Sequence, residues 1–171
     1  GLYKNIVRAD PRGRTVFKVL DDLRELGADI QPNIVTQLDD DGVLVLTLNR
    51  PERKNAFNDE QWDTTADTLR QANEDPRVAV VVLTGSGGNF SSGVDLSSFQ
   101  ANPEPRSDGF ESAFHAFVPA LFAFEKPLIA AVQGVAIGGG ATIPMACDFV
   151  YAGESLRMRL PFANLGLVPE I

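Results

Sequence analysis

Three consecutive glycines in the stretch AIGGGATIPMACD, at positions 138–140, separate an apolar run from a second apolar segment. The pattern predicts a strand that turns tightly into a helix. The first N–H groups of a helix have no acceptor inside it, and the helix dipole is positive at that end. Such amides can hold an oxygen that becomes negative during a reaction. Close packing of the helix against the strand would also require glycine, so the pattern alone leaves two interpretations open.

A second glycine turn lies in NFSSGVDLSSF, residues 89–99, directly after another apolar run. N–H groups from the two turns would form an oxyanion hole if they converged on one oxygen. The glycine triplet is not a GxGxxG dinucleotide motif, and no acidic residue follows at the distance that would bind a ribose. The serines of this turn have no histidine partner at a recognisable spacing, so serine-nucleophile chemistry is not indicated.

Both turns must be positioned by strands and helices that alternate along the chain. Residues 33–48 predict a β-hairpin whose Asp-Asp-Asp-Gly turn is solvated, because its carboxylates lack the alternating spacing of a calcium loop. The remaining pattern predicts strands at 78–85, 128–134 and 149–153, and helices at 59–73, capped by Asn58, and 110–124. This order indicates an α/β domain, in which ligands bind at the carboxyl ends of the strands.

Residues 1–32 predict an N-terminal extension, separate from the domain at 33–171. Within it, GRTVFKVLDDLRELG predicts a short amphipathic helix that ends at Gly27. We assign no chemistry to this extension.

Composition narrows the class of protein. The 171 residues are 44% hydrophobic, enough for one domain with a substantial core, and their net charge of −8 argues against nucleic acid or an anionic membrane as partner. A single cysteine and a single histidine exclude a disulfide framework and the usual zinc sites, so no metal is expected. No apolar stretch reaches the roughly 20 residues of a membrane span, and no signal peptide is recognisable. We therefore expect a cytoplasmic protein, with an organelle lumen as the alternative.

Four motifs carry a resemblance to a known family: LTLNRPERKNAFN, VVLTGSGGNFSSGVDLSSF, KPLIAAVQGVAIGGGATIPMACDFVYAG and PFANLGLVPE. In this order and spacing, residues 33–171 resemble the crotonase superfamily of enoyl-CoA hydratases and isomerases. The resemblance implies a β-β-α spiral core that binds acyl-CoA, with coenzyme A entering as part of the substrate and no other cofactor. It also implies a homotrimer or a dimer of trimers. The family's C-terminal helical segment is lacking here, so we expect a truncated core.

The resemblance further implies residues of the binding site. The thioester oxygen would be held by the main-chain N–H groups of Val94 and Gly139. Coenzyme A would be bound by Arg53, Lys54, Ala56, Phe57, Asp95 and Leu96. The residues themselves agree in one respect, because Arg50, Arg53 and Lys54 are the one compact basic cluster of an acidic chain and coenzyme A carries phosphates. An ordinary solvated loop is the alternative interpretation of that cluster.

The residues that would move a proton distinguish the reactions of this family. The hydratases of the family are similar in having two glutamates in the site. This chain has Thr142 and Phe162 at those two positions, and we assign both residues to the acyl pocket. The isomerase branch, and the peroxisomal-type Δ3,Δ2-enoyl-CoA isomerases in particular, is similar in having a glutamate at the position of Glu170. We expect apolar neighbours, namely Phe162, Leu165, Leu167 and Val168, to desolvate this carboxylate and raise its pKa.

The sequence thus predicts an isomerase of fatty acid metabolism that converts 3-enoyl-CoA to 2-enoyl-CoA through an enolate, with Glu170 as its base. Two alternatives remain. One is another crotonase-type reaction, either hydration by a lyase or acyl-CoA hydrolysis. The other is an acyl-CoA-binding subunit without catalysis. The sequence stops one residue after Glu170. If the chain is a fragment of a longer protein, we expect it to be inactive by itself, and if the remainder is only not represented, the isomerase prediction stands.

Overall fold

The computed structural model describes residues 32–98, 106–169 and 171. The helix predicted within residues 13–27 and the predicted base Glu170 lie outside the described residues, so both stay predictions. Asn33–Ile171 forms one compact unit, and the elements below belong to it. No helix in the described ranges combines the length and the apolar character needed to cross a membrane.

An antiparallel hairpin begins the unit, as predicted. It pairs β1 (Ile34–Leu38) with β2 (Val43–Leu48). The Asp39 carboxylate accepts hydrogen bonds from the N–H groups of Asp41 and Val43, at 3.0 and 2.8 Å. The aspartates therefore stabilise a turn, and within the described ranges no group of His, Cys, Asp or Glu side chains could hold a metal ion.

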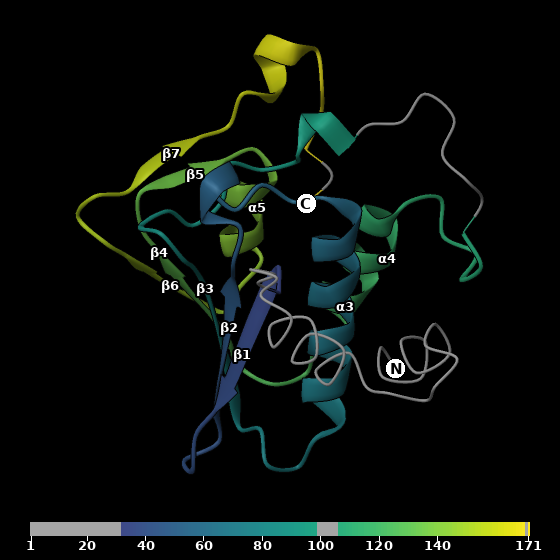
Figure 1. Cartoon of the computed structure of the whole chain (residues 1–171), viewed down its shortest axis with the longest axis vertical. Helices are drawn as coiled ribbons and strands as arrows, with labels where there is room; N and C mark the ends of the chain where they lie inside the picture. The colour runs from purple at the N-terminus through teal and green to yellow at the C-terminus, as the bar shows by residue number, and fades with distance from the viewer. Residues whose placement is uncertain (1–31, 99–105, 170) are drawn as a thin grey trace, which may run out of the picture. The chain divides into compact units, whose positions relative to one another are not determined.

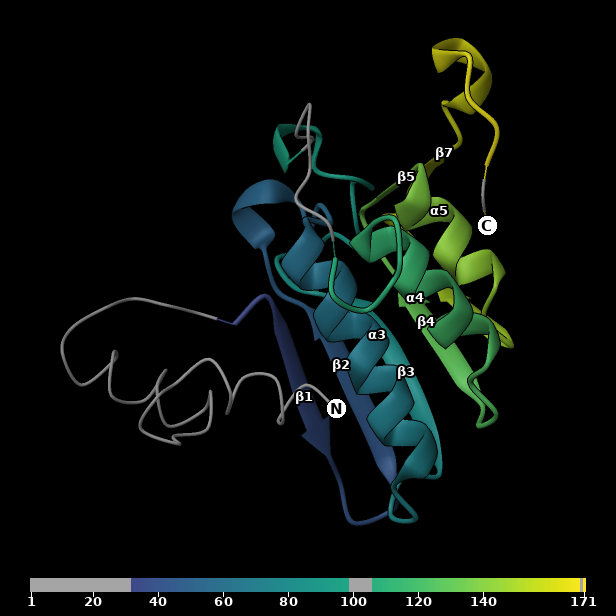
Figure 2. The same ribbon diagram turned by 90° about the vertical axis from the view of Figure 1, so that its right-hand side faces the viewer.

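The main sheet has the strand order β1-β2-β3-β4-β6. It continues from β2 through β3 (Val80–Gly85), β4 (Leu128–Val132) and β6 (Phe149–Ala152), and these four strands are parallel. The parallel strands of a sheet need long crossover connections. In Figures 1 and 2 the helices α3 (Asp59–Glu74) and α4 (Ala113–Phe122) lie together on one face of this sheet. The mixed α/β architecture agrees with the predicted fold class.

Helix α3 begins where the sequence predicts it. The Asn58 side chain accepts a hydrogen bond from the N–H of Gln61 at 2.9 Å and so caps the first turn. Its buried face places Trp62, Ala66 and Leu69 in the core between helices and sheet. Burial of each large apolar side chain contributes roughly 1.5–3 kcal/mol to stability.

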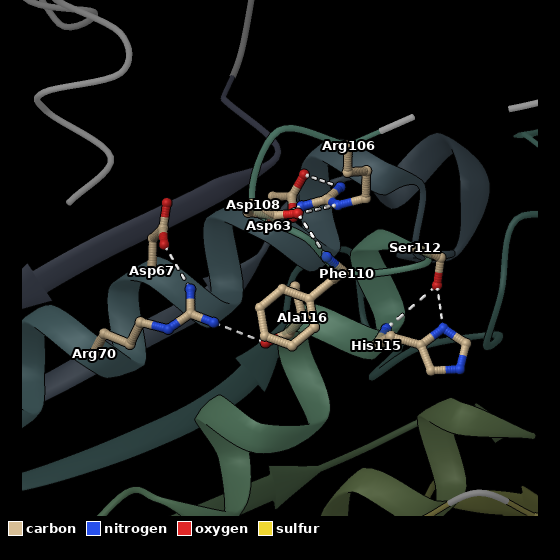
Figure 3. A network of polar contacts seen from close by, with 9 residues as sticks. All are labelled: Asp63, Asp67, Arg70, Arg106, Asp108, Phe110, Ser112, His115 and Ala116. Atoms are coloured by element: carbon tan, nitrogen blue, oxygen red, sulfur yellow. Dashed lines mark hydrogen bonds and ion pairs between the residues drawn. The ribbon is translucent and has the colours of Figure 1, made fainter. Parts of the chain in front are cut away.

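Helix α4 begins later than predicted. The predicted start near Phe110 is wrong, because the Asp108 carboxylate accepts the N–H of Phe110 in a turn and Ser112 caps the helix at its true start. Arg106 joins this turn to α3 through paired hydrogen bonds to Asp63 at 3.0 and 2.7 Å (Figure 3). The apolar period of residues 110–124 could not reveal these polar side chains.

A smaller parallel sheet pairs β5 (Val135–Ile137) with β7 (Arg157–Arg159). The short helix α5 (Gly139–Met145) follows β5 directly. Three 3₁₀ turns complete the described unit: η1 (Pro51–Arg53), η2 (Leu96–Ser98) and η3 (Phe162–Leu165).

Candidate active site

The turn between β5 and α5 is formed by the glycine triplet. Gly138 has φ 55° and ψ −123°, a conformation that essentially only glycine adopts. Its N–H donates to the carbonyl of Arg159 at 3.0 Å, and its carbonyl accepts from Ala141 and Thr142. Gly139 is the first residue of α5. Its N–H has no acceptor in the described part of the chain.

The second glycine turn packs directly against the first. The N–H of Ile137 donates to the carbonyl of Ser91 at 3.0 Å, and the N–H of Ser91 donates to Val135 at 3.0 Å. A Cβ atom added to Gly140 would lie 2.3 Å from the Ser91 oxygen, and one added to Gly93 would lie 3.5 Å from the Gly139 nitrogen. Gly140 is thus a packing glycine, as the alternative interpretation held. The same contact brings the two turns together.

Val94 is held by the main chain of Phe57. The N–H of Phe57 donates to the Gly93 carbonyl, and the N–H of Asp95 donates to the Phe57 carbonyl, both at 2.8 Å. Because N–H groups alternate in direction along extended chain, the N–H of Val94 points away from Phe57. It has no acceptor within the described residues. The oxyanion role of Val94 and Gly139 stays a prediction, but their turns are in contact.

The basic cluster divides into structural and exposed members. Arg50 forms an ion pair with Asp95, with Nη2 2.9 Å from Oδ2, and also donates to the carbonyl of Ala56. Hydrogen bonds from Ser97, and then from Arg50, hold the pKa of Asp95 below its ordinary value. Arg50 is therefore engaged inside the protein, while Arg53 and Lys54 are exposed.

Asn55 was missed by the sequence analysis and connects two loops, its own and the loop that follows β3. It is fully buried with φ 54°, a left-handed conformation that asparagine tolerates better than most residues. Its Oδ1 accepts the N–H of Arg50, and its Nδ2 donates to the carbonyls of Ser86 and Asn89 at 2.9 and 2.8 Å. An asparagine in a predicted loop could have signalled such a turn.

The side chains predicted to bind coenzyme A have unequal access. Leu96 is 80% exposed, like the exposed Arg53 and Lys54, whereas Ala56 and Phe57 are buried. Phe57 stacks on Trp62 with ring centroids 3.9 Å apart. Trp62 was assigned no role by the sequence analysis, because an apolar residue on a helix face is ordinarily a core residue. The coenzyme A assignments stay predictions.

The two positions where hydratases resemble one another in glutamate carry no carboxylate here. Thr142 is buried in α5, and its hydroxyl donates to the carbonyl of Gly139 at 3.4 Å. Phe162 is half-buried in η3.

Burial raises the pKa of the Cys147 thiol to about 12, so this cysteine is no thiolate nucleophile at neutral pH.

Three of the residues expected to form an apolar pocket around Glu170 are exposed. Because Glu170 lies outside the described residues, the pocket itself stays a prediction. Leu165, Leu167 and Val168 are 64, 58 and 81% exposed. Figure 1 shows their segment in yellow, extending past β7 beyond the sheet. Apolar side chains form a pocket only where other elements pack on them, and no described element packs on these three.

A family model described as "Enoyl-CoA hydratase/isomerase" matches residues 39–171. The chain belongs to this family. Among curated relatives, 1,2-epoxyphenylacetyl-CoA isomerase of Escherichia coli is 41% identical over 133 residues, which are 75% of this chain and 51% of the relative. Human enoyl-CoA delta isomerase 2 is 36% identical over 77% of this chain and 34% of its own length. The E. coli 2,3-dehydroadipyl-CoA hydratase is 38% identical over 74% of this chain and 49% of its own length.

Solved structures of the family share the fold. The enoyl-CoA hydratase/isomerase of Pseudoalteromonas atlantica superposes with a TM-score of 0.74 at 42% identity, covering 81% of this chain and 53% of that one. The chain spans about half the length of the two E. coli relatives and of this structure. The identities do not separate isomerases from hydratases within this enoyl-CoA hydratase/isomerase family.

Proposed function

We propose that the chain carries the core of an isomerase that moves a double bond in an acyl-CoA thioester, from 3-enoyl-CoA to 2-enoyl-CoA. The observation that carries the proposal is the contact between the turns of Gly93 and Gly139. The N–H of Val94, which follows Gly93, and the N–H of Gly139 have no acceptor in the described residues. Main-chain amides placed in this way suit an oxygen that gains negative charge.

In the proposed reaction the thioester oxygen accepts hydrogen bonds from Val94 and Gly139. These bonds acidify the carbon next to the carbonyl and stabilise the enolate that forms when its proton leaves. Loss of one such donor typically costs about 10²–10³ in rate. Coenzyme A would lie along the loop of Arg53 and Lys54, whose cations are exposed and suit its phosphates.

We assign the transfer of the proton to Glu170 because of the family resemblance. Its carboxylate would take a proton from C2 and return it at C4, which requires no activated water. Thr142 and Phe162 cannot supply the carboxylates that water addition would use. The whole protein's substrates, its location in the cytoplasm and its assembly into homotrimers or dimers of trimers belong to the same proposal.

Hydration is the second candidate, because a hydratase is among the relatives at similar identity. The test offers the full gene product a 3-enoyl-CoA and, in a separate assay, a 2-enoyl-CoA, because water adds only to a double bond that is conjugated with the thioester. Isomerisation gives a conjugated product of unchanged mass, hydration adds one water, and hydrolysis releases free coenzyme A. Binding without any product would indicate a non-catalytic acyl-CoA-binding subunit.

Substitution of the base sharpens this test. Glu170→Gln should abolish turnover and leave the affinity for coenzyme A within about threefold, because the amide keeps the shape but cannot accept the proton. Glu154→Gln is the matched control, since Glu154 is an exposed glutamate between β6 and β7. Turnover that survives Glu170→Gln would remove this residue from the mechanism.

A further inference from the structure

We infer that Trp62 is a positioning residue that sets the relative placement of the Val94 and Gly139 amides. The inference rests on the proposed use of these amides. It goes beyond that proposal by assigning their geometry to a side chain on another element, helix α3.

The indole of Trp62 faces the first turn of α5. A Cβ atom added to Gly139 would lie 3.6 Å from Cη2 and 4.0 Å from Cζ2 of the indole. Apart from its chain neighbours and its own helix, such a Cβ would meet no other atom of the described residues within 4 Å. The benzo edge of Trp62 therefore faces Gly139 across a gap of about one methyl group.

Trp62 also contacts the residue that holds Val94. Its ring stacks on Phe57, with centroids 3.9 Å apart and planes 20° apart. The main chain of Phe57 in turn binds Gly93 and Asp95, the residues on either side of Val94. One side chain thus faces the turn of Gly139 and, through Phe57, supports the turn of Val94.

The indole is itself held in place. It is 2% exposed, and Phe114 and Phe117 of α4 pack on it at centroid distances of 5.1 and 5.0 Å. The Asn58 cap fixes the helical turn from which it projects. A rigid support of this kind matters, because a misplacement of about 1 Å can cost about 100-fold in rate.

The test compares three variants of the full gene product. Trp62→Phe keeps a ring that can stack on Phe57 and removes the benzo edge that faces Gly139. Trp62→Leu removes both contacts. Leu69→Ala is the matched control, because Leu69 is buried on the same face of α3 and its loss also leaves a cavity in the core.

The direct readout is the carbonyl stretch of a bound saturated acyl-CoA, labelled with ¹³C at the thioester carbon, in infrared difference spectra. The wild-type protein should lower this frequency. In both Trp62 variants this lowering of the frequency should be smaller than in the wild type. Their kcat should fall about 10- to 100-fold, and their KM should stay within about threefold of the wild-type value. Leu69→Ala should retain the full shift and the kcat of the wild type.

Other outcomes separate this inference from the proposed function. An unchanged shift in both Trp62 variants, or an equal loss in Leu69→Ala, would overturn the role of Trp62. A wild-type protein that polarises the carbonyl without isomerising would refute the isomerase assignment, and the variants would still decide the role of Trp62. No shift in the wild type would overturn both. If Trp62→Leu does not fold, Trp62→Phe decides.

Discussion

Neighbouring glycines of the triplet meet different surroundings, which gives each a different role. A Cβ atom on Gly140 would lie 2.3 Å from the main-chain oxygen of Ser91, a contact that only backbone movement could relieve. A Cβ atom on Gly139 would meet the indole of Trp62 at an ordinary 3.6 Å. Gly140 therefore lets the two turns approach, while the side of Gly139 that faces Trp62 has room for a methyl group.

This difference predicts opposite effects of two alanine substitutions. Gly140→Ala should destabilise the protein by about 3 kcal/mol or more, since the clash forces the turns apart. Gly139→Ala should change stability by less than about 0.5 kcal/mol and still lower thioester turnover, because the methyl group would fill the gap between this turn and Trp62. Urea denaturation and steady-state kinetics measure both effects. Equal stability of the two variants would contradict the packing role of Gly140.

Among the structural elements, those that follow local rules were predicted well. The hairpin turn, the apolar strands and the Asn58 cap depend on neighbours in the sequence, and the structure confirms all three. The β5–β7 sheet was not predicted, because the sequence RMR of β7 has no strand pattern and is ordered by pairing with distant Val135–Ile137.

The candidate site shows the same division between local and distant signals. The two glycine turns were recognised from their composition, and their contact is present. The supports, Asn55 and Trp62, were not recognised, because a buried asparagine and a core tryptophan acquire their roles only from distant loops. The apolar pattern of helix α3 also did not reveal a feature that lowers stability. The side-chain amide of Gln61 is buried without a hydrogen-bond partner in the described ranges.

The ion pair of Arg50 and Asp95 joins the segments that lead into η1 and η2, and its stabilising effect should depend on pH. The pKa of Asp95 is lowered in the folded protein from an ordinary 3.8. Its stabilisation is therefore present above about pH 4 and is lost as the pH falls below that value through the folded pKa. The cause is that protonation removes the acceptor for Ser97 and Arg50.

Asp95→Asn should lower stability at pH 7 by about 2 kcal/mol or more, because Arg50 is left nearly buried without its counter-charge. The variant should also lose less stability than the wild type between pH 4 and pH 2. Urea midpoints over this range measure both effects. Asp41→Asn, in the exposed hairpin turn, should keep the wild-type profile, and an unchanged slope in Asp95→Asn would show that the pair does not titrate as described.

At the scale of the whole molecule, the two edges of the main sheet differ. β1 at one edge is followed by a turn of three aspartates, and in the described part of the chain it exposes Val35 as its one large apolar side chain. β6 at the other edge exposes Phe149, Val150 and Tyr151, by 60, 46 and 69%. In the described residues no strand pairs with the outer edge of β6. Open edges with exposed apolar side chains promote pairing between chains.

We therefore expect the 171-residue chain to self-associate through β6 in a concentration-dependent manner. Charged residues on a strand edge oppose such pairing. The double substitution Phe149→Lys and Tyr151→Lys places two charges on one face of β6 and should raise the concentration needed for association at least about tenfold, a free-energy change of about 1.4 kcal/mol. Sedimentation velocity over a dilution series measures this. Val35→Lys introduces a charge at the opposite edge and should leave association unchanged, so equal effects of the two changes would show that net charge, and not the β6 edge, controls assembly.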